Sequence, residues 1–511
     1  MRKIYPYLIL IAFIYACGEK PTQTENTVLS EISTLEKHRP QFHFTPDSMW
    51  MNDPNGMVFY KDTYHLFYQY YPDSTVWGPM HWGHAVSKDM VSWEHKPIAL
   101  YPDELGYIFS GSAVLDVNNS SGLGSKENPP LVAIFTYHDP IKAEAKQIDV
   151  ESQGIAFSLD NGETWEKYAK NPVLKNPGIR DFRDPKVRWF EPTQRWIMTL
   201  AAQDHIRFYS SPNLKEWILE SEFGKELGAH DGVWECPDLF PITVEGENEM
   251  YWILIVNLNP GAPNGGSGTQ YFIGKFNGHT FVNTDEKTRW ADYGPDNYAG
   301  VTWSNTGDRI LFMGWMSNWK YANIVPTEKW RSATTIAREL KLQKIHGDLV
   351  LCSLPVEEFE KVTSPVFETQ NLEIDAPYNV SKAAKSNIST CELNMEIEHL
   401  DGFKVILSNE LSNQVMLSYD KKENRFLIDR SKSGNVSFHP EFGNEIITPR
   451  ISTEKSMKLK LVIDVASMEV FADDGSTVLT VVYFPNEALD QIAIVPETTL
   501  SVSKLSMRDI E

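Results

Sequence analysis

Cysteine is scarce in this chain, with four residues among 511. Cys17 belongs to an apolar stretch near the N-terminus, and Cys236, Cys352 and Cys391 show no paired spacing. An odd number of remaining cysteines without paired spacing gives neither a disulfide framework nor a zinc-binding pattern. We therefore expect packing alone to hold the fold together.

Positive charge is also in short supply. The chain has 47 Lys and Arg residues against 69 Asp and Glu residues, a formal net charge of -22. A nucleic acid would need clustered Lys and Arg, so the composition predicts no nucleic-acid partner. It also disfavours a polyanionic substrate and favours a neutral one.

Long hydrophobic runs are absent beyond the first residues. Arg2 and Lys3 precede "IYPYLILIAFIYACG", which is too short for a membrane span and is typical of an export signal. Its end, "FIYACG", resembles a bacterial lipobox, so residues 1–17 predict a lipoprotein signal peptide with Cys17 as the lipidated residue. An ordinary signal peptide that is cleaved nearby is the alternative. The polar residues 18–37 predict a flexible tether, and the protein is expected to be exported and membrane-anchored at the periplasmic face or the cell surface.

Aromatic residues are abundant, at 12% of the chain with 15 Trp and 21 Tyr. Flat side chains of this kind stack on sugars, although strand cores account for most of them in any β protein. A Ser-to-Trp pattern recurs as "SKDMVSW" at 87–93, "SLDNGETW" at 158–165 and "SSPNLKEW" at 210–217. Each copy lies between short β-rich runs and predicts a hairpin with a polar turn.

A second repeat sets the predicted architecture. Segments that begin at Asn52, Arg183 and Glu235 each contain an acid, a proline within two residues, an apolar strand, a polar turn and a second strand. Segments from Phe109 and Tyr298 follow the same plan without the acid. About five strand-only units of this size predict a propeller of five blades, with a plain β-sandwich and chance similarity as the alternative.

The predicted fold is therefore all-β, a five-bladed β-propeller followed by a C-terminal β-sandwich. The propeller occupies residues 38–350, a linker 351–365 and the sandwich 366–511. Alternating segments such as "VMLSYDKKENRFLIDRS" predict the hairpins of the sandwich. The sandwich has no acid cluster, so it is expected to be structural rather than a sugar-binding accessory.

The acids of the repeat are the catalytic candidates. Equivalent positions in a radial repeat lie at equivalent distances from the axis, so Asp53, Asp184 and Glu235 are expected at one register and in one pocket. Turn formation alone does not explain why the acid recurs. Clustered carboxylates have split pKa values, which supply a proton donor and an anionic nucleophile at one pH, as glycoside cleavage requires.

Metal binding is the rival use of three carboxylates. Calcium loops show alternating acids, and no such pattern lies near these residues, so neither a metal nor a cofactor is predicted. Arg183 is expected either to reach the pocket or to form a surface ion pair of little value, with neither alternative favoured. Cys236 is expected to be a buried small residue, because a reactive thiol needs an electropositive setting.

The motifs "WMNDPNG", "FRDP" and "WECPDLF", in this order, resemble the three signature blocks of glycoside hydrolase family 32, the fructan hydrolases and invertases. The resemblance runs from about His38 onward and implies the propeller-plus-sandwich fold. It implies that Asp53 is the nucleophile that attacks the anomeric carbon of a fructosyl unit. It further implies that Glu235 is the acid/base and that Asp184, with Arg183 beside it, stabilises the transition state.

The same resemblance implies a set of fructose-binding residues, each of which has a core role as its alternative. They are Asn52, Gln69, Trp77, Phe109, Ser110, Arg183 and Trp315. "GGSGTQYFIG" resembles exo-acting levanases and inulinases, so the expected activity is release of fructose from levan or inulin, with sucrose as a further substrate. The alternatives are an endo-acting fructanase, a fructosyltransferase, a sialidase-like propeller suggested by "SLDNGETW", and a non-catalytic glycan-binding lipoprotein.

Overall fold

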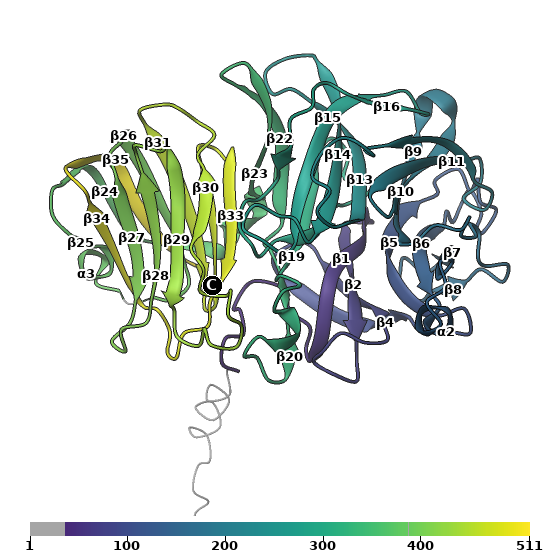
Figure 1. Ribbon diagram of the computed structural model, residues 1–511, viewed down its shortest axis with the longest axis horizontal. Coiled ribbons are helices and arrows are strands. Elements are labelled where there is room, and N and C mark those ends of the chain that lie inside the picture. The colour runs from purple at the N-terminus through teal and green to yellow at the C-terminus, as the bar shows by residue number, and fades with distance from the viewer. Residues whose placement is uncertain (1–35, 387, 511) are drawn as a thin grey trace, which may run out of the picture. The chain divides into compact units, whose positions relative to one another are not determined.

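Strands make up nearly all the regular structure in residues 36–386 and 388–510, the residues that the computed structural model describes (Figure 1). The α-helices among them, α2 (Pro140–Glu144) and α3 (Val380–Ala384), are one short turn or little more. The all-β prediction is confirmed. The signal peptide, Cys17 and nearly all of the tether lie outside the described residues. Within the described part of the chain, no helix is long and apolar enough to cross a membrane.

Five sheets follow one another along residues 49–355, and most neighbouring strands in them are antiparallel (Figure 1). The first contains β1 (Met49–Tyr60), β2 (Thr63–Tyr71), β3 (His81–Ser87) and β4 (Trp93–Leu100). The second contains β5 (Tyr107–Leu115), β6 (Leu131–His138), β7 (Glu151–Ser158) and β8 (Glu166–Lys167). The third contains β9 (Phe182–Phe190), β10 (Arg195–Ala202), β11 (His205–Ser211) and β12 (Ile218–Phe223).

The fourth and fifth sheets carry additional short edge strands. The fourth contains β13 (Val233–Thr243), β14 (Met250–Asn259), β15 (Gly268–Phe276), β16 (Phe281–Asn283) and β17 (Arg289–Trp290). The fifth contains β18 (Tyr298–Thr302), β19 (Leu311–Met316), β21 (Ala333–Thr334), β22 (Arg338–Ile345) and β23 (Asp348–Pro355). The five strand-turn-strand repeats of the sequence are the first two strands of these five sheets.

The first sheet takes one strand from far along the chain. β20 (Trp330–Arg331) lies beside β1 as a parallel neighbour, with Met49 opposite Trp330. The Met49 N–H donates to the Lys329 carbonyl at 2.7 Å. The sheet that carries Asp53 is therefore completed by residues that follow the first strand of each of the other four sheets in the sequence. We call the first strand of each sheet its leading strand.

Two six-stranded sheets form the C-terminal region (Figure 1). One has the order β24 (Thr363–Ile374), β35 (Leu500–Ile510), β26 (Cys391–His399), β31 (Met457–Asp464), β32 (Ser467–Ala472), β33 (Thr477–Val482). The other has the order β25 (Tyr378–Asn379), β34 (Gln491–Pro496), β27 (Phe403–Ser408), β28 (Gln414–Asp420), β29 (Arg425–Lys432), β30 (Ile446–Pro449). Alternate residues of both sheets, such as Leu393 and Leu417, are buried in one shared core, so the sheets pack face to face.

A buried group of charges joins the N-terminal and C-terminal regions. We call it the interface cluster, and it consists of His43, Asp292, Arg338, Asp464 and Glu469. The His43 ring lies 2.7 Å from an Asp464 oxygen and 2.8 Å from a Glu469 oxygen. Arg338 donates to Glu469 and, at 2.9 Å, to Asp292. Each carboxylate thus has a cation or several N–H donors beside it, as buried charges require.

Candidate active site

The leading strands of the sheets share a backbone irregularity that shapes the site. In β1, β9, β13 and β18 the strand pairing shifts around Asp53, Asp184, Cys236 and Ala299. These residues have positive φ values of 25°, 65°, 41° and 53°, and each is followed by proline or glycine. A β-bulge of this kind bends the strand and changes the direction of its side chains. In each of these four sheets, the bulge residue and the residue before it therefore lie at the equivalent position of the first strand.

The expectation that all three acids share one register is wrong. Asp53 and Asp184 are bulge residues, whereas Glu235 precedes the bulge residue Cys236 and corresponds to Arg183. The reason is the spacing to proline, which follows the two aspartates directly but follows Glu235 after one residue. The acids still meet, because the bulge turns both positions toward the same pocket.

Asp53 and Asp184 are bridged by one residue of the fourth sheet. The Cys236 thiol lies 3.5 Å from Oδ2 of Asp53 and 3.6 Å from Oδ2 of Asp184. The Cys236 backbone N–H also donates to Asp184 at 3.0 Å. Asp53 accepts further hydrogen bonds from the Asn52 amide at 2.8 Å and from the Ser110 hydroxyl at 2.9 Å. The two carboxylates predicted from separate repeats are thus brought together.

Arg183 connects Glu235 to the same group. Its guanidinium donates to Oε1 of Glu235 at 3.2 and 3.0 Å and to Asp181 at 2.6 Å. It also lies 4.0 Å from Asp184. Of the two alternatives for Arg183, the structure places the side chain against the carboxylates, because the bulge at Asp184 redirects it. Only 13% of this side chain is exposed, so the ion pair is not a surface pair.

The pocket holds more negative charge than Arg183 neutralises. Burial, opposed by the Asn52 hydrogen bond and increased by repulsion from Glu235, raises the pKa of Asp53 to about 6. Burial, opposed by Arg183 and increased by Glu235 and Asp53, raises the pKa of Asp184 to about 7. Burial, together with Asp184, Asp53 and Glu235, raises the pKa of the Cys236 thiol well above its ordinary value, which disfavours the thiolate form.

Sequence reasoning missed Tyr298 as a site residue. This buried side chain donates a hydrogen bond to Oε2 of Glu235, so Glu235 is held from both sides by Tyr298 and Arg183. The available signal was its place at the start of the fifth repeat, directly before a bulge residue. Cys236 was correctly expected to be buried, but its contacts with both aspartates were not foreseen.

The predicted fructose-binding residues border the acids. Gln69 lies opposite Asn52 in the β1–β2 ladder, and Trp315 lies opposite Tyr298 in the β18–β19 ladder. The amide nitrogen of Gln69 and the indole nitrogen of Trp315 are buried, with no hydrogen-bond partner among the described residues. Because buried donors are normally satisfied, the unpartnered N–H groups of Gln69 and Trp315 indicate a place where a ligand could supply acceptors.

Trp77 and Phe109 extend the site toward solvent. Their rings meet edge to face at 6.0 Å, and 40% of Trp77 is exposed. An exposed aromatic ring near a polar pocket suits the apolar face of a sugar. Residues 36–386 and 388–510 contain no group of three or more His, Cys, Asp or Glu side chains arranged to hold a metal ion.

An all-β protein in which Asp53, Asp184 and Glu235 are linked through Cys236 and Arg183 has the groups of a glycoside hydrolase. Residues 43–353 match the glycosyl hydrolases family 32 N-terminal domain, and residues 358–509 match the family 32 C-terminal domain. The chain belongs to glycosyl hydrolase family 32, which confirms the family predicted from the motifs.

Curated relatives and solved structures agree with this membership. The chain is 48% identical to a levanase of Bacillus subtilis over 466 residues, 89% of this chain and 67% of the relative. It is 37% identical to an extracellular exo-inulinase of Aspergillus niger over 88% of this chain and 90% of the relative. The crystal structure of exo-inulinase from Aspergillus awamori superimposes with a TM-score of 0.86 at 33% identity, covering 93% of this chain and 99% of that one. A fructofuranosidase from Schwanniomyces occidentalis complexed with fructose has a TM-score of 0.84 at 33% identity, covering 93% and 98%.

Proposed function

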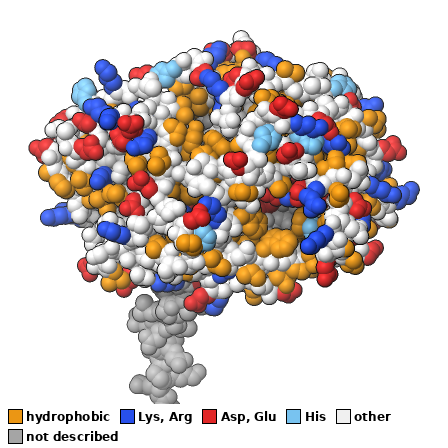
Figure 2. All heavy atoms as spheres, in the orientation of Figure 1, with side chains coloured by type: hydrophobic (Ala, Val, Ile, Leu, Met, Phe, Trp, Pro, Cys, Tyr) orange, Lys and Arg blue, Asp and Glu red, His pale blue; other side chains and the backbone are white. Residues whose placement is uncertain are grey.

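We propose that this chain is an exo-acting, retaining fructan hydrolase that releases fructose from levan or inulin and also cleaves sucrose. The observation that carries the proposal is the meeting of Asp53, Asp184 and Glu235 around Arg183 and Cys236. The substrate class is supported by the levanase and exo-inulinase relatives. A neutral fructan also suits a chain of net charge -22, on which acidic and basic side chains lie interspersed over the face shown in Figure 2.

In the proposed reaction, the Asp53 carboxylate attacks the anomeric carbon of the terminal fructosyl unit. Glu235 donates its proton to the leaving oxygen as the glycosidic bond breaks, which gives a fructosyl-enzyme ester. Glu235 then removes a proton from water, the water oxygen attacks the anomeric carbon, and Asp53 leaves as the carboxylate. Two displacements at one carbon release fructose with its configuration retained.

The surrounding residues position these two groups. Asn52 and Ser110 donate to Asp53 and favour its ionised form, as a nucleophile requires. Arg183 and Tyr298 fix the two oxygens of Glu235. Asp184 is proposed to accept hydrogen bonds from fructose hydroxyls, which strengthen as the transition state gains positive charge. Gln69 and Trp315 supply the unpartnered donors for the remaining sugar oxygens.

The proposal includes the finer architecture and the location of the enzyme. The five sheets are proposed to be the blades of a propeller whose leading strands surround the site, and the two six-stranded sheets a structural β-sandwich. The superposition on the Aspergillus awamori exo-inulinase over 93% of this chain supports this arrangement. The protein is proposed to be exported and anchored through a lipid on Cys17, as the N-terminal sequence and the extracellular relatives suggest.

Substitution of the two reacting acids tests the assignment. Asp53→Ala should lower fructose release from levan by roughly 10⁴–10⁶-fold, the scale of losing a nucleophile. Glu235→Ala should lower it by roughly 10²–10⁴-fold, the scale of losing an acid/base. Products are resolved by chain length, and circular dichroism checks the fold. Asp204→Asn, at a carboxylate that is half exposed, is the control and should keep full activity. Near-normal rates in either alanine variant would show that the assigned roles are wrong.

A further inference from the structure

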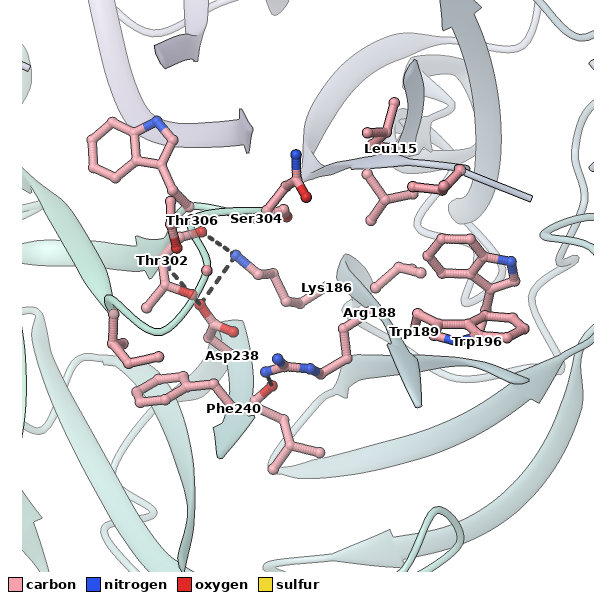
Figure 3. Close-up of a pocket in the computed structure, with 18 of the residues that line it drawn as sticks. Leu115, Lys186, Arg188, Trp189, Trp196, Asp238, Phe240, Thr302, Ser304 and Thr306 are labelled. Carbon is pink, nitrogen blue, oxygen red and sulfur yellow. Dashed lines mark hydrogen bonds and ion pairs between the residues drawn. The ribbon is translucent and has the colours of Figure 1, made fainter. Parts of the chain in front are cut away.

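A cavity lies farther along the strands that carry the acids, and Figure 3 shows the side chains around it. It has a volume of about 390 Å³ and is lined by parts of β5, β9, β10, β13 and β18 and by the segments after β5 and β18. Lys186 follows Asp184 by two residues and Asp238 follows Glu235 by three, which is roughly 7–10 Å along an extended strand. None of the residues that act in the proposed reaction lines this cavity.

Asp238 presents an unsatisfied acceptor there. One of its oxygens, Oδ2, lies 3.1 Å from the Lys186 ammonium and accepts two hydrogen bonds of 2.7 Å from the Thr302 N–H and hydroxyl. The other oxygen, Oδ1, is buried and has no hydrogen-bond partner among the described residues. Only 1% of the Asp238 side chain surface reaches solvent. A buried carboxylate oxygen without a donor is costly, so the site calls for one.

Arg188 presents unused donors in the same cavity. One of its five N–H groups donates to the Leu239 carbonyl at 2.8 Å, and its guanidinium lies over the Trp252 ring. Burial, opposed by the nearby Asp238, lowers the pKa of Arg188 to about 10. In Figure 3 the Arg188 and Asp238 side chains both extend into the same part of the cavity. Together they offer donors and an acceptor at one place.

Two tryptophans give the cavity an apolar wall (Figure 3). The rings of Trp189 and Trp196 meet edge to face at 5.2 Å. Their indole N–H groups are already used, by Glu191 at 2.6 Å and Ser120 at 2.8 Å. What remains for a ligand is ring surface, which suits the C–H face of a sugar.

We propose that this cavity binds a small neutral polyhydroxylated molecule of the monosaccharide class. One hydroxyl donates to Oδ1 of Asp238, a neighbouring hydroxyl accepts from Arg188, and the C–H face packs on Trp189. The volume falls within the usual range of small-molecule pockets, about 300–1,000 Å³.

The surrounding charges exclude the other ligand classes. A metal cation is disfavoured because the Lys186 ammonium already occupies Asp238. An anion is disfavoured because Oδ1 of Asp238 needs a donor and repels negative charge. A hydroxyl group both donates and accepts, so it satisfies both residues. The inference does not depend on the roles assigned to Asp53 and Glu235.

Crystals of the full chain soaked with fructose test the site directly. We expect electron density for a sugar between Asp238 and Arg188, separate from any sugar near Asp53. Density for water alone at this position would overturn the proposal. Density for phosphate in crystals soaked with phosphate and fructose together would also overturn it, because it would assign an anion to the cavity.

Equilibrium dialysis with radiolabelled fructose tests the site in solution. The wild-type chain should bind two fructose molecules, and Arg188→Met should bind one. The control Arg195→Met, on the adjacent strand and outside the cavity, should bind two. Fructose release from levan should be unchanged in Arg188→Met. Where Arg188→Met does not fold, Arg188→Lys can be used instead. It keeps the positive charge but loses the planar guanidinium donors, so the affinity of the second site for fructose should fall at least about tenfold.

The outcomes separate this inference from the proposed function. The inference would be overturned if a folded Arg188→Met chain bound two fructose molecules. It would also be overturned if the wild-type chain bound a single fructose and Arg188→Met still bound it. Neither result would affect the hydrolase assignment. A site lost in Arg188→Met from a chain that does not hydrolyse fructan would support the inference and contradict the proposed function.

Discussion

The candidate active site, which contains Asp53, Asp184 and Glu235, and the interface cluster both hold several carboxylates, but they differ in the cations that accompany them. In the pocket, Arg183 is shared among Glu235, Asp181 and Asp184, and the pKa values of Asp53 and Asp184 are raised. In the interface cluster, Arg338 and His43 both serve Glu469, and the pKa of Glu469 is lowered despite its burial.

The comparison shows two uses of the same chemistry. The interface cluster compensates its acids with cations that stay charged, since burial is outweighed by Asp464 and Glu469 and the pKa of His43 rises to about 9. It therefore ties the N-terminal segment to the C-terminal sheets across the neutral pH range. The pocket leaves its acids incompletely compensated, which keeps protonation near neutrality adjustable. That is the condition a nucleophile and a proton donor require.

The largest expected effect comes from breaking the compensated cluster. Arg338→Met leaves Glu469 and Asp292 buried without their arginine, so it should lower the free energy of unfolding by about 3–5 kcal/mol. Thermal and denaturant unfolding measure this loss. Lys287→Met, which removes an exposed ion pair with Asp348, is the control and should change stability by about 0–1 kcal/mol. Equal losses in the two variants would show that the cluster is not compensated as described.

The second effect has the opposite sign and lies in the pocket. Because folding raises the pKa of Asp184 to about 7, its contribution to stability is present below about pH 4 and is lost as pH rises toward 7. Asp184→Asn should therefore stabilise the protein at pH 8 by on the order of 1–3 kcal/mol and have little effect near pH 4. Melting temperatures of both proteins across this range measure it. Fructose release should be lost at every pH. If Asp184→Asn were less stable than the wild-type protein at pH 8, the excess of negative charge described for this site would be wrong.

A smaller effect concerns the acid limb of the pH–rate profile. If Asp53 must be ionised to react, kcat/KM should fall below about pH 6. Ser110→Ala removes a hydrogen bond that favours the ionised form, so the limb should move up by about one pH unit. Ser112→Ala is the matched control on the same strand, because its hydroxyl donates to the Pro185 carbonyl, accepts from the Val187 N–H and contacts no carboxylate. If the acid limb of the Ser110→Ala profile stayed at the wild-type pH, Asp53 would not be the group whose ionisation limits the rate.

The smallest expected effect is that of a chelator. EDTA should leave fructose release unchanged, because the proposed reaction uses only side chains and water. The measurement is the rate before and after dialysis against EDTA and after adding back calcium. A large loss restored by calcium would mean that a cation completes the pocket, and the contrast with the interface cluster would disappear.

Local repeats predicted the acids but not their exact alignment. The acid-and-proline pattern identified Asp53, Asp184 and Glu235, since each motif is short and contiguous. The pattern did not reveal that one acid precedes the bulge and two occupy it, because backbone bulges depend on pairing with the next strand. Tyr298 was overlooked for the same reason, as a residue without charge in a repeat that lacks the acid.

The contacts of the interface cluster could not be predicted from the sequence. His43 and Glu469 are separated by 426 residues, and no pattern in the sequence pairs them. Contacts of this length arise from how whole sheets pack, which periodicity within a segment does not encode. The cavity beside Asp238 also had no signature in the sequence, because its lining residues come after the acid-and-proline motifs along the same strands.

The parallel pairing of β20 with β1 sets an order of events in biosynthesis. Trp330 and Arg331 complete the edge of the sheet that holds Asp53, so a nascent chain shorter than this point lacks part of its own first sheet. An emerging polypeptide therefore cannot complete the sheet that carries Asp53 until some 280 residues after Asp53 have been made.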